Sequence, residues 1–320
     1  MSSVSNDIEK AVLHLSNDEV VAIPTETVYG LAGNAFSEKA VKTIFEVKQR
    51  PFFNPLIVHT HAVELVETFV SHFPQKARAL AERFWPGSLT LVLNKKDIIP
   101  GIITAGKNTV AVRIPDHPVT LELLKRLPFP LAAPSANPFG SISPTKSKHV
   151  EEYFSDVIPM VLEGGSCKNG LESTIIGFEN NEPLVYRLGA ISLEDIESVI
   201  GKVNVKNSSA SSPAAPGMLL RHYAPSTPTI LVENLNNELS HIKNKRIGVV
   251  SFFSDFSNSE NITSVVLSKT KNLKEAGANL YNALHQLDQL NLDLIIAEKL
   301  PDEGLGKSIN DRLFRATQKH

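Results

Sequence analysis

Cysteine is almost missing from this sequence, and long apolar runs are missing altogether. The single cysteine, Cys167, excludes an internal disulfide and a metal cage built from cysteines, and it fits a reducing compartment. Residues 1–10 carry no apolar signal core, and no stretch of about 18 apolar residues occurs anywhere in the chain. We therefore expect a soluble protein of the cytoplasm.

A clear surplus of charge is also missing. The chain has 32 basic and 34 acidic residues, its basic residues cluster no further than pairs such as Lys95-Lys96, and aromatic residues make up only 7%. Nucleic-acid surfaces need clustered basic residues or aromatics interleaved along strands, so no DNA or membrane partner is expected. An RNA-binding module without turnover stays open as the alternative function, and salt-sensitive RNA binding would favour it.

The most informative stretch that is present follows an apolar run at residues 20–23. Pro24 removes a ladder donor and so ends a strand, and the next residues supply two hydroxyls and a carboxylate. Such a strand end is typical of a binding loop, in which glycines let the backbone approach a ligand closely. The polar residues are Thr25, Glu26 and Thr27, and the glycines are Gly30 and Gly33. The alternative is a simple turn with a solvated carboxylate.

A helix with cations at its end is predicted from Ser37 to about Lys48. Ser37 fits an N-cap, and Pro51 disfavours helical backbone at Arg50, so this guanidinium leaves the helix on extended chain. Lys48 and Arg50 are candidate anion contacts, since arginine recognises planar anions such as phosphate in a bidentate way. The alternative is that both cations satisfy the helix dipole. The apolar residues with a mostly helical period are Ala40, Val41, Ile44, Phe45 and Val47.

Polar groups also stand at the ends of three further predicted strands. The segment 134–137, with Ser135 and Asn137, follows the apolar strand 131–133, His59 ends a strand at 55–59, and Arg113 ends one at 109–113. Arg113 has no obvious helix to cap. We interpret His59 as a substrate contact, because no Cys, His or Asp cluster nearby has metal-ligand spacing, and no metal site is expected. The alternative is a structural histidine.

These strand ends belong to a first domain of mixed α/β type, which we place at residues 1–203. Its natural architecture is a twisted open sheet with a concave face. The expected strands lie near residues 20–23, 55–59, 89–93, 109–113, 131–133, 157–162, 174–178 and 184–187.

A smaller domain is expected after a change in composition. The Ser, Ala and Pro residues between about 203 and 216 have no periodic apolar face, so we place an interdomain linker or lid at 204–226. In the remainder, 227–320, the runs 229–232, 246–250 and 294–297 predict buried parallel strands, and 272–290 predicts a helix. This alternation favours a Rossmann-like α/β domain. Since no Gly-x-Gly-x-x-Gly follows its strands, no dinucleotide site is expected there.

Taken in order, the motifs between residues 10 and 200 resemble the signature of the YrdC-type threonylcarbamoyl-adenylate synthases. Any one motif is weak, but the ordered set is highly specific. The resemblance implies a twisted open sheet with a ligand groove, followed in longer members by a C-terminal domain of the kind expected here. The matching motifs are the Pro-Thr-Glu-Thr-x-Tyr-Gly-Leu loop from Pro24, the Lys-x-Arg pair from Lys48, the Ser-x-Asn element from Ser135, and the stretches 54–59, 85–87, 109–113, 143–145 and 172–175.

The resemblance implies a nucleotidyltransferase. Members condense L-threonine, bicarbonate or carbon dioxide, and ATP to threonylcarbamoyl-AMP and pyrophosphate. The product serves threonylcarbamoylation of the tRNA adenosine beside the anticodon (t6A), so the implied partner is the tRNA threonylcarbamoyl transferase complex. Magnesium is expected with the triphosphate, with Glu26 as a candidate contributor near it. Related hydrogenase-maturation proteins, a second alternative, would add zinc-binding cysteines, which this sequence does not have.

The resemblance also implies site residues by motif position. At Leu219 and Leu220 most members have a basic residue and then an aromatic one, so Leu220 would offer the nucleotide only an aliphatic or backbone contact. His222 and Tyr223 match the motif and could equally be an interdomain packing anchor. The L-threonine site would comprise Thr27, His59, Arg113 for the carboxylate, Ala133 through its backbone, and Ser173. Lys48 and Arg50 would be the catalytic residues, which hold the triphosphate. The ATP site would comprise Arg50, Asn54, Thr109, Ser135, Ser143, Arg187 and Leu220.

Overall fold

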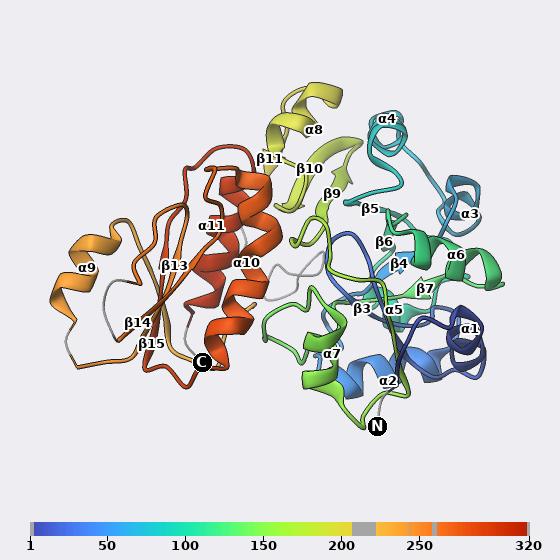
Figure 1. Ribbon diagram of the computed structural model, residues 1–320. Helices are drawn as coiled ribbons and strands as arrows, with labels where there is room; N and C mark the ends of the chain where they lie inside the picture. Colours follow the sequence, from blue (N-terminus) through green and yellow to red (C-terminus); the bar gives the residue numbers. More distant parts are fainter. Residues whose placement is uncertain (1–2, 207–221, 243, 258–260, 319–320) are drawn as a thin grey trace.

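The computed structural model describes residues 3–206, 222–242, 244–257 and 261–318, which form two units with a sheet each (Figure 1). The first unit carries an eleven-stranded sheet and the C-terminal unit a four-stranded one. Both sheets are covered by helices, as expected for α/β architecture. The expected linker is described only at its ends, residues 204–206 and 222–226, and Leu219 and Leu220 lie outside the described residues.

The first sheet contains every strand that the apolar runs predict. Its order is β1-β8-β2-β3-β7-β4-β6-β5-β9-β10-β11, with parallel and antiparallel neighbours mixed. The predicted strands are β2 (Val21–Ile23), β4 (Ile57–His59), β5 (Leu89–Asn94), β6 (Thr109–Arg113), β7 (Leu131–Ala132), β8 (Met160–Leu162), β9 (Thr174–Glu179) and β10 (Glu182–Arg187). The sequence did not indicate the other three, which are β1 (Ser3–Ser5), β3 (Gly30–Asn34) and β11 (Asn204–Val205).

Strand β3 corrects the expectation that Gly30 and Gly33 serve a loop. It pairs antiparallel with β2 and with β7, so the polar residues 24–29 form the loop between two neighbouring strands. A Cβ on Gly30 would lie 3.3 Å from the Ala133 Cβ, and one on Gly33 would lie 3.2 Å from Ile44. Gly33 therefore permits close packing of β3 against α2, and Gly30 permits close approach of β3 to the segment that follows β7.

The helix that carries Lys48 is α2 (Glu38–Lys48). Ser37 is its N-cap, as predicted, and its hydroxyl accepts from the Ala40 N–H at 3.2 Å. Gln49 ends the helix in the left-handed conformation, so Arg50 lies off the helix as expected. The other helices of this unit are α1 (Ile8–Ser16), α3 (Val63–Phe69), α4 (Gln75–Phe84), α5 (Gly101–Thr104), α6 (Pro118–Arg126), α7 (Ser147–Phe154) and α8 (Leu193–Ile200).

The C-terminal unit has a sheet of order β12-β15-β13-β14 in which all neighbours are parallel. The predicted elements are β12 (Thr229–Val232), β13 (Ile247–Ser251), β15 (Leu294–Glu298) and α10 (Leu273–Asp288), while β14 (Ile262–Val266), α9 (Leu235–His241) and α11 (Leu305–Ala316) were not indicated. Asn272 caps α10 by accepting from the N–H groups of Lys274 and Glu275. Helices α10 and α11 lie between this sheet and the first unit (Figure 1).

The two units share one apolar cluster. Val28, Ile142 and Leu171 of the first unit pack in it with α10 residues such as Leu280 and Leu284. Burial of apolar surface at about 25 cal/mol per Å² makes a shared core of this kind a strong constraint on how the units sit together.

Two histidines stack across the same interface. The rings of His149 in α7 and His285 in α10 lie 3.8 Å apart at an interplanar angle of 21°. His149 Nδ1 accepts from the Thr145 N–H at 3.3 Å, and His285 Nε2 donates to the Ser143 carbonyl at 3.2 Å. The pair thus joins α10 to the segment 143–145 of the first unit.

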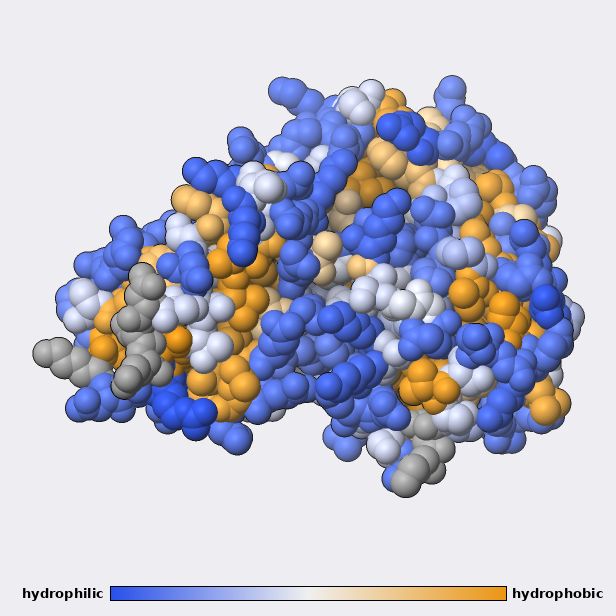
Figure 2. All heavy atoms as spheres, in the orientation of Figure 1, coloured by the Kyte–Doolittle hydropathy of each residue, from blue (hydrophilic) through white to orange (hydrophobic). Residues whose placement is uncertain are grey.

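The surface shown in Figure 2 is largely hydrophilic, with apolar side chains gathered in separate groups. Among the residues that the structure describes, no helix has the length and apolar character needed to cross a membrane.

The stacked histidines predict a loss of stability in mild acid. Burial lowers the pKa of His149 to about 3 and that of His285 to about 4. Below the ordinary histidine pKa of about 6.5, the unfolded chain binds protons that the folded protein does not. The free energy of unfolding should therefore fall from pH 6.5 to 4, by about 1.4 kcal/mol per pH unit for each ring.

Urea unfolding between pH 4.5 and 7 measures this slope. In His285→Gln, the slope of the unfolding free energy against pH should be smaller by the contribution of one histidine ring. The matched control is His241→Gln, which changes an exposed histidine of α9 and should keep the slope of the original protein. Equal slopes for all three proteins would contradict the prediction.

Candidate functional site

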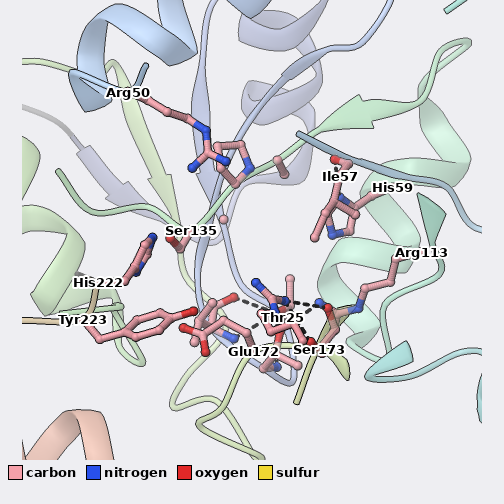
Figure 3. A pocket seen from close by; sticks show the side chains of 16 residues that line it. Thr25, Arg50, Ile57, His59, Arg113, Ser135, Glu172, Ser173, His222 and Tyr223 are labelled. Carbon is pink, nitrogen blue, oxygen red and sulfur yellow. Dashed lines mark hydrogen bonds between the residues drawn. The ribbon is translucent and has the colours of Figure 1, made fainter. Parts of the chain in front are cut away.

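A cavity opens where several strand ends of the first unit meet residues 222–223, at the C-terminal end of the linker (Figure 3). Arg50, Ser135 and His222 lie toward one end of it, and His59 and Arg113 toward the other. The cavity is lined by Thr25, Thr27, Val28, Gly30, Arg50, Ile57, His59, Arg113, Ala133, Pro134, Ser135, Glu172, Ser173, Arg187, His222 and Tyr223.

One end of the cavity is organised around Arg113, which is 4% exposed. Its guanidinium forms an ion pair with Glu26, donates to the Thr27 hydroxyl at 2.9 Å and donates to the Gly87 carbonyl at 3.0 Å. The Glu26 carboxylate also accepts from the Ser88 hydroxyl at 2.9 Å. These contacts use three of the five N–H groups of Arg113, so it can still donate two to a ligand carboxylate.

His59 lies beside Arg113 because β4 and β6 are parallel and the two residues are register partners. Burial and the Arg113 charge lower the pKa of His59 to about 3, so its ring is neutral at physiological pH. Its Nδ1 donates to the Ile57 carbonyl at 3.2 Å, which fixes the ring orientation. A neutral His59 ring next to Arg113 can contact an uncharged polar group of a ligand.

The other end of the cavity collects positive charge. Burial and the neighbouring Arg187 charge lower the pKa of Arg50 to about 9, which still leaves it cationic at neutral pH. Arg187 donates to the Ser173 carbonyl at 2.8 Å and to its hydroxyl at 3.1 Å, and that hydroxyl bonds Thr90 at 2.7 Å. Two arginines that face one cavity and repel each other favour a bound anion.

Comparisons with known proteins agree with this geometry. A Sua5, YciO and YrdC family model described as "Telomere recombination" matches residues 14–189, and one described as "Threonylcarbamoyl-AMP synthase, C-terminal domain" matches residues 191–318. The chain belongs to the Sua5/YrdC family, in its two-domain form. Similar curated proteins are threonylcarbamoyl-AMP synthases of Pyrococcus abyssi, 41% identical over 93% of this chain and 90% of the relative, and of Bacillus subtilis, 39% identical over 99% and 94%.

Solved structures of the family superpose over nearly the whole chain. P. abyssi Sua5 complexed with L-threonine matches with a TM-score of 0.89 and 38% identity, covering 99% of this chain and 97% of that one. A double-alanine variant of the same protein, changed at a histidine and a tyrosine, matches with a TM-score of 0.91 and 37% identity, covering 99% and 96%. The expected fold of the family, a twisted sheet plus a C-terminal α/β domain, is confirmed.

The five residues that family resemblance places at L-threonine all line the cavity, as do three of the ATP set. The threonine residues are Thr27, His59, Arg113, Ala133 and Ser173, and the ATP residues are Arg50, Ser135 and Arg187. They come together because they lie at or next to strand ends or in the short segments that follow a strand or α2, with Thr27 in the loop between β2 and β3.

Lys48, Asn54, Thr109 and Ser143 do not line the cavity. Lys48 is turned to the Ser135 and Asn137 carbonyls, to which its Nζ donates, and so it joins α2 to the segment 135–137. Asn54 is fully buried, and its side-chain amide has no hydrogen-bond partner among the residues that the structure describes. Thr109 begins the strand that Arg113 ends, and it lines a separate surface recess with residues such as His72 and Asn181.

Glu172 is the cavity residue to which the sequence motif gave no role. Its carboxylate accepts from the Ser143 hydroxyl at 2.7 Å, which places Ser143 behind the cavity wall. The motif at residues 172–175 includes this glutamate, but its role could not be derived locally, because its partners come from distant segments, including Tyr281 and Arg312 of the C-terminal unit.

His222 and Tyr223 both line the cavity and pack between the units. The His222 ring meets Phe139 edge-on at 5.9 Å, and Tyr223 packs against Tyr281 at 5.7 Å and under the Arg312 guanidinium at 4.9 Å. The Nδ1 atom of His222 and the hydroxyl of Tyr223 are buried, and neither has a hydrogen-bond partner in the described part of the chain. Unsatisfied polar atoms at a cavity wall are typical of a ligand site.

The Glu26–Arg113 pair predicts a large structural penalty when it is broken. Glu26→Gln removes the counter-charge and leaves a buried guanidinium uncompensated, which should lower the free energy of unfolding by about 3–5 kcal/mol. Urea unfolding at pH 7 measures the loss. The control is Glu122→Gln, which breaks the exposed pair with Arg126 and should have little effect. Equally small losses in both variants would show that the buried pair is not required.

Proposed function

We propose that this protein synthesises threonylcarbamoyl-AMP from L-threonine, bicarbonate or carbon dioxide, and ATP, with release of pyrophosphate. The observation that carries the proposal is the difference in charge between the two ends of one cavity. At one end, Arg113 is paired with Glu26 and keeps two N–H groups, which can bind one ligand carboxylate. At the other end, Arg50 and Arg187 supply positive charge. An amino acid and a polyphosphate can therefore bind with their reacting groups between the two ends.

The reaction requires two bonds to form. The threonine amine adds to carbon dioxide and loses a proton, which gives a carbamate. A carbamate oxygen then bonds to the α-phosphorus of ATP, the bond from that phosphorus to the bridging oxygen breaks, and pyrophosphate leaves. Transfers of this kind depend on in-line positioning and charge neutralisation more than on a protein nucleophile.

The residues of the cavity match these needs. In the proposal, Arg113 and Thr27 hold the threonine carboxylate, and the neutral His59, the Ala133 backbone and Ser173 surround the rest of the amino acid. Arg50 and Arg187 hold the phosphates, with Ser135 beside them. Closure of the cavity by His222 and Tyr223 would keep water from the mixed anhydride product.

Magnesium enters the proposal only with the nucleotide. Among the described residues, no group of three or more His, Cys, Asp or Glu side chains could hold a metal. Both carboxylates near the cavity are engaged, Glu26 by Arg113 and Ser88, and Glu172 by Arg312, Tyr281 and Ser143. The expected contribution of Glu26 to a magnesium site therefore has no support. MgATP would bring its ion bound to phosphates and water.

The proposal includes a place in tRNA modification. Threonylcarbamoyl-AMP is an activated acyl group, so a transferase that places it on the tRNA adenosine beside the anticodon (t6A) must consume it, and we propose the tRNA threonylcarbamoyl transferase complex as the downstream partner. We further propose that the protein works in the cytoplasm, because its one cysteine, Cys167, is a free, buried thiol that suits a reducing compartment.

Substrate dependence tests the function directly. Purified protein with MgATP should release pyrophosphate and form an AMP-containing product only when threonine and bicarbonate are both present. Release of pyrophosphate can be measured by a coupled assay and the product by chromatography. Equal pyrophosphate release without threonine would contradict the proposal, and salt-sensitive RNA binding without any turnover would favour the RNA-binding alternative.

Arg50→Ala tests the phosphate end of the cavity. Loss of one charged contact to the transferring phosphoryl group should reduce turnover by about two orders of magnitude, or about 3 kcal/mol in transition-state stabilisation. Arg50 also donates to the Asn54 and Pro55 carbonyls, so stability must be measured beside turnover. Turnover is therefore expressed per folded molecule, with Arg78→Ala as an exposed control. Full turnover per folded Arg50→Ala molecule would assign this arginine a structural role only.

A further inference from the structure

Arg312, in α11 of the C-terminal unit, reaches two strand ends of the first unit. Its Nε donates to Glu172 Oε2 at 2.8 Å, and its Nη2 donates to the Leu188 carbonyl at 2.6 Å. Glu172 directly precedes Ser173 before β9, and Leu188 directly follows Arg187 at the end of β10. One guanidinium of the second unit thus joins the two segments that carry Ser173 and Arg187 into the cavity.

The contacts of Glu172 leave neither carboxylate oxygen without a donor. Oε1 accepts from Ser143 at 2.7 Å, and Oε2 accepts from Tyr281 at 2.9 Å as well as from Arg312. The Arg312 and Glu172 side chains are 1% and 7% exposed. Although burial works against ionisation, the Arg312 and Arg187 charges hold the pKa of Glu172 below its usual range.

Helix α10 packs closely on the segment before Glu172. A Cβ on Gly170 would lie 2.5 Å from the Ala278 carbonyl oxygen, and Gly170 has a φ of +64° that favours glycine. A Cβ on Gly277 would lie 3.0 Å from the Leu171 side chain. The segment therefore has little room to move while the C-terminal unit is in place.

A carboxylate on the wall of this cavity opposes the binding of a polyphosphate. Glu172 lines the same cavity as Arg50 and Arg187, and like charges in a buried site repel strongly because solvent screens them poorly. The larger part of the counter-charge comes from Arg312 of the second unit, from behind the wall, and Arg187 of the first unit adds to it.

We propose that Arg312 is a positioning residue for nucleotide binding, which neutralises Glu172 from outside the cavity and fixes the strand ends that carry Ser173 and Arg187. The C-terminal unit is then part of the nucleotide site, although none of its own helices or strands lines the cavity. This inference rests on the proposed function, since it assigns the phosphates of ATP to this end of the cavity.

Arg312→Gln in the full chain tests the proposal, with Lys307→Gln as a matched control. Lys307 lies in the same helix and also pairs with the first unit, at 2.7 Å from Glu194, but this pair is partly exposed and away from the cavity. Arg312→Gln should raise the ATP Kd, measured by calorimetry, and the ATP KM about 30-fold or more, with a smaller effect on the threonine KM. The control should match the original protein.

Two further readouts separate charge compensation from a purely structural role. Without Arg312 the pKa of Glu172 should rise, so the ATP Kd of Arg312→Gln, relative to that of the original protein, should improve as the pH falls from 8 to 6. The double variant Arg312→Gln/Glu172→Gln removes the uncompensated charge and should recover about tenfold in ATP affinity over the single variant. A structural role alone would give neither result.

The outcomes are distinct. The proposal is overturned if Arg312→Gln binds ATP like Lys307→Gln, or if it binds ATP weakly with neither pH dependence nor recovery in the double variant. If Arg312→Gln does not fold, Tyr281→Phe replaces it, because this variant removes a single donor to Glu172. Tyr281→Phe should also weaken ATP binding, and an unchanged ATP affinity would overturn the proposal. If the original protein binds ATP without threonine-dependent turnover, the proposed function fails, and the ATP affinities still decide the role of Arg312.

Discussion

The structure depends on the compensation of charges that are buried around one cavity. Arg50, Arg113, Arg187 and Arg312 are all at most 8% exposed, and Glu26 pairs with Arg113 while Glu172 and the partly exposed Asp311 pair with Arg312. An isolated buried charge costs several kcal/mol, so each pair must form as the chain folds.

The same constraint explains why the two units are joined so closely. The first unit supplies Glu172, and the second supplies its partners Arg312 and Tyr281, so neither unit alone satisfies the group. Around this polar centre lies an apolar cluster shared by both units, and the stacked His149 and His285 rings lie at its side. A polar network inside an apolar interface fixes the register of the two units, because any shift would leave donors or acceptors unpaired.

Local signals in the sequence predicted the strands that carry apolar runs and failed for those that do not. Val21–Ile23 and Thr109–Arg113 were found because consecutive apolar residues bounded by turn formers favour buried strands. Gly30–Asn34 was missed, since its glycines have low strand propensity and pair only because β2 and β7 lie on either side. β14 and α11 were also missed, although both are well formed in the C-terminal unit.

The sequence by itself determined the family, the two-unit organisation of α/β type and the residue types at each strand end, because motifs and apolar periodicity are local properties of the chain. It also placed Arg50 off its helix, through Pro51. Only the tertiary structure decided which polar groups meet. Lys48 turns to the carbonyls of residues 135–137, Thr109 lies a strand length from Arg113, and Glu172 finds its counter-charge 140 residues away at Arg312. Pairing of buried charges depends on distances across the fold, which no local pattern encodes.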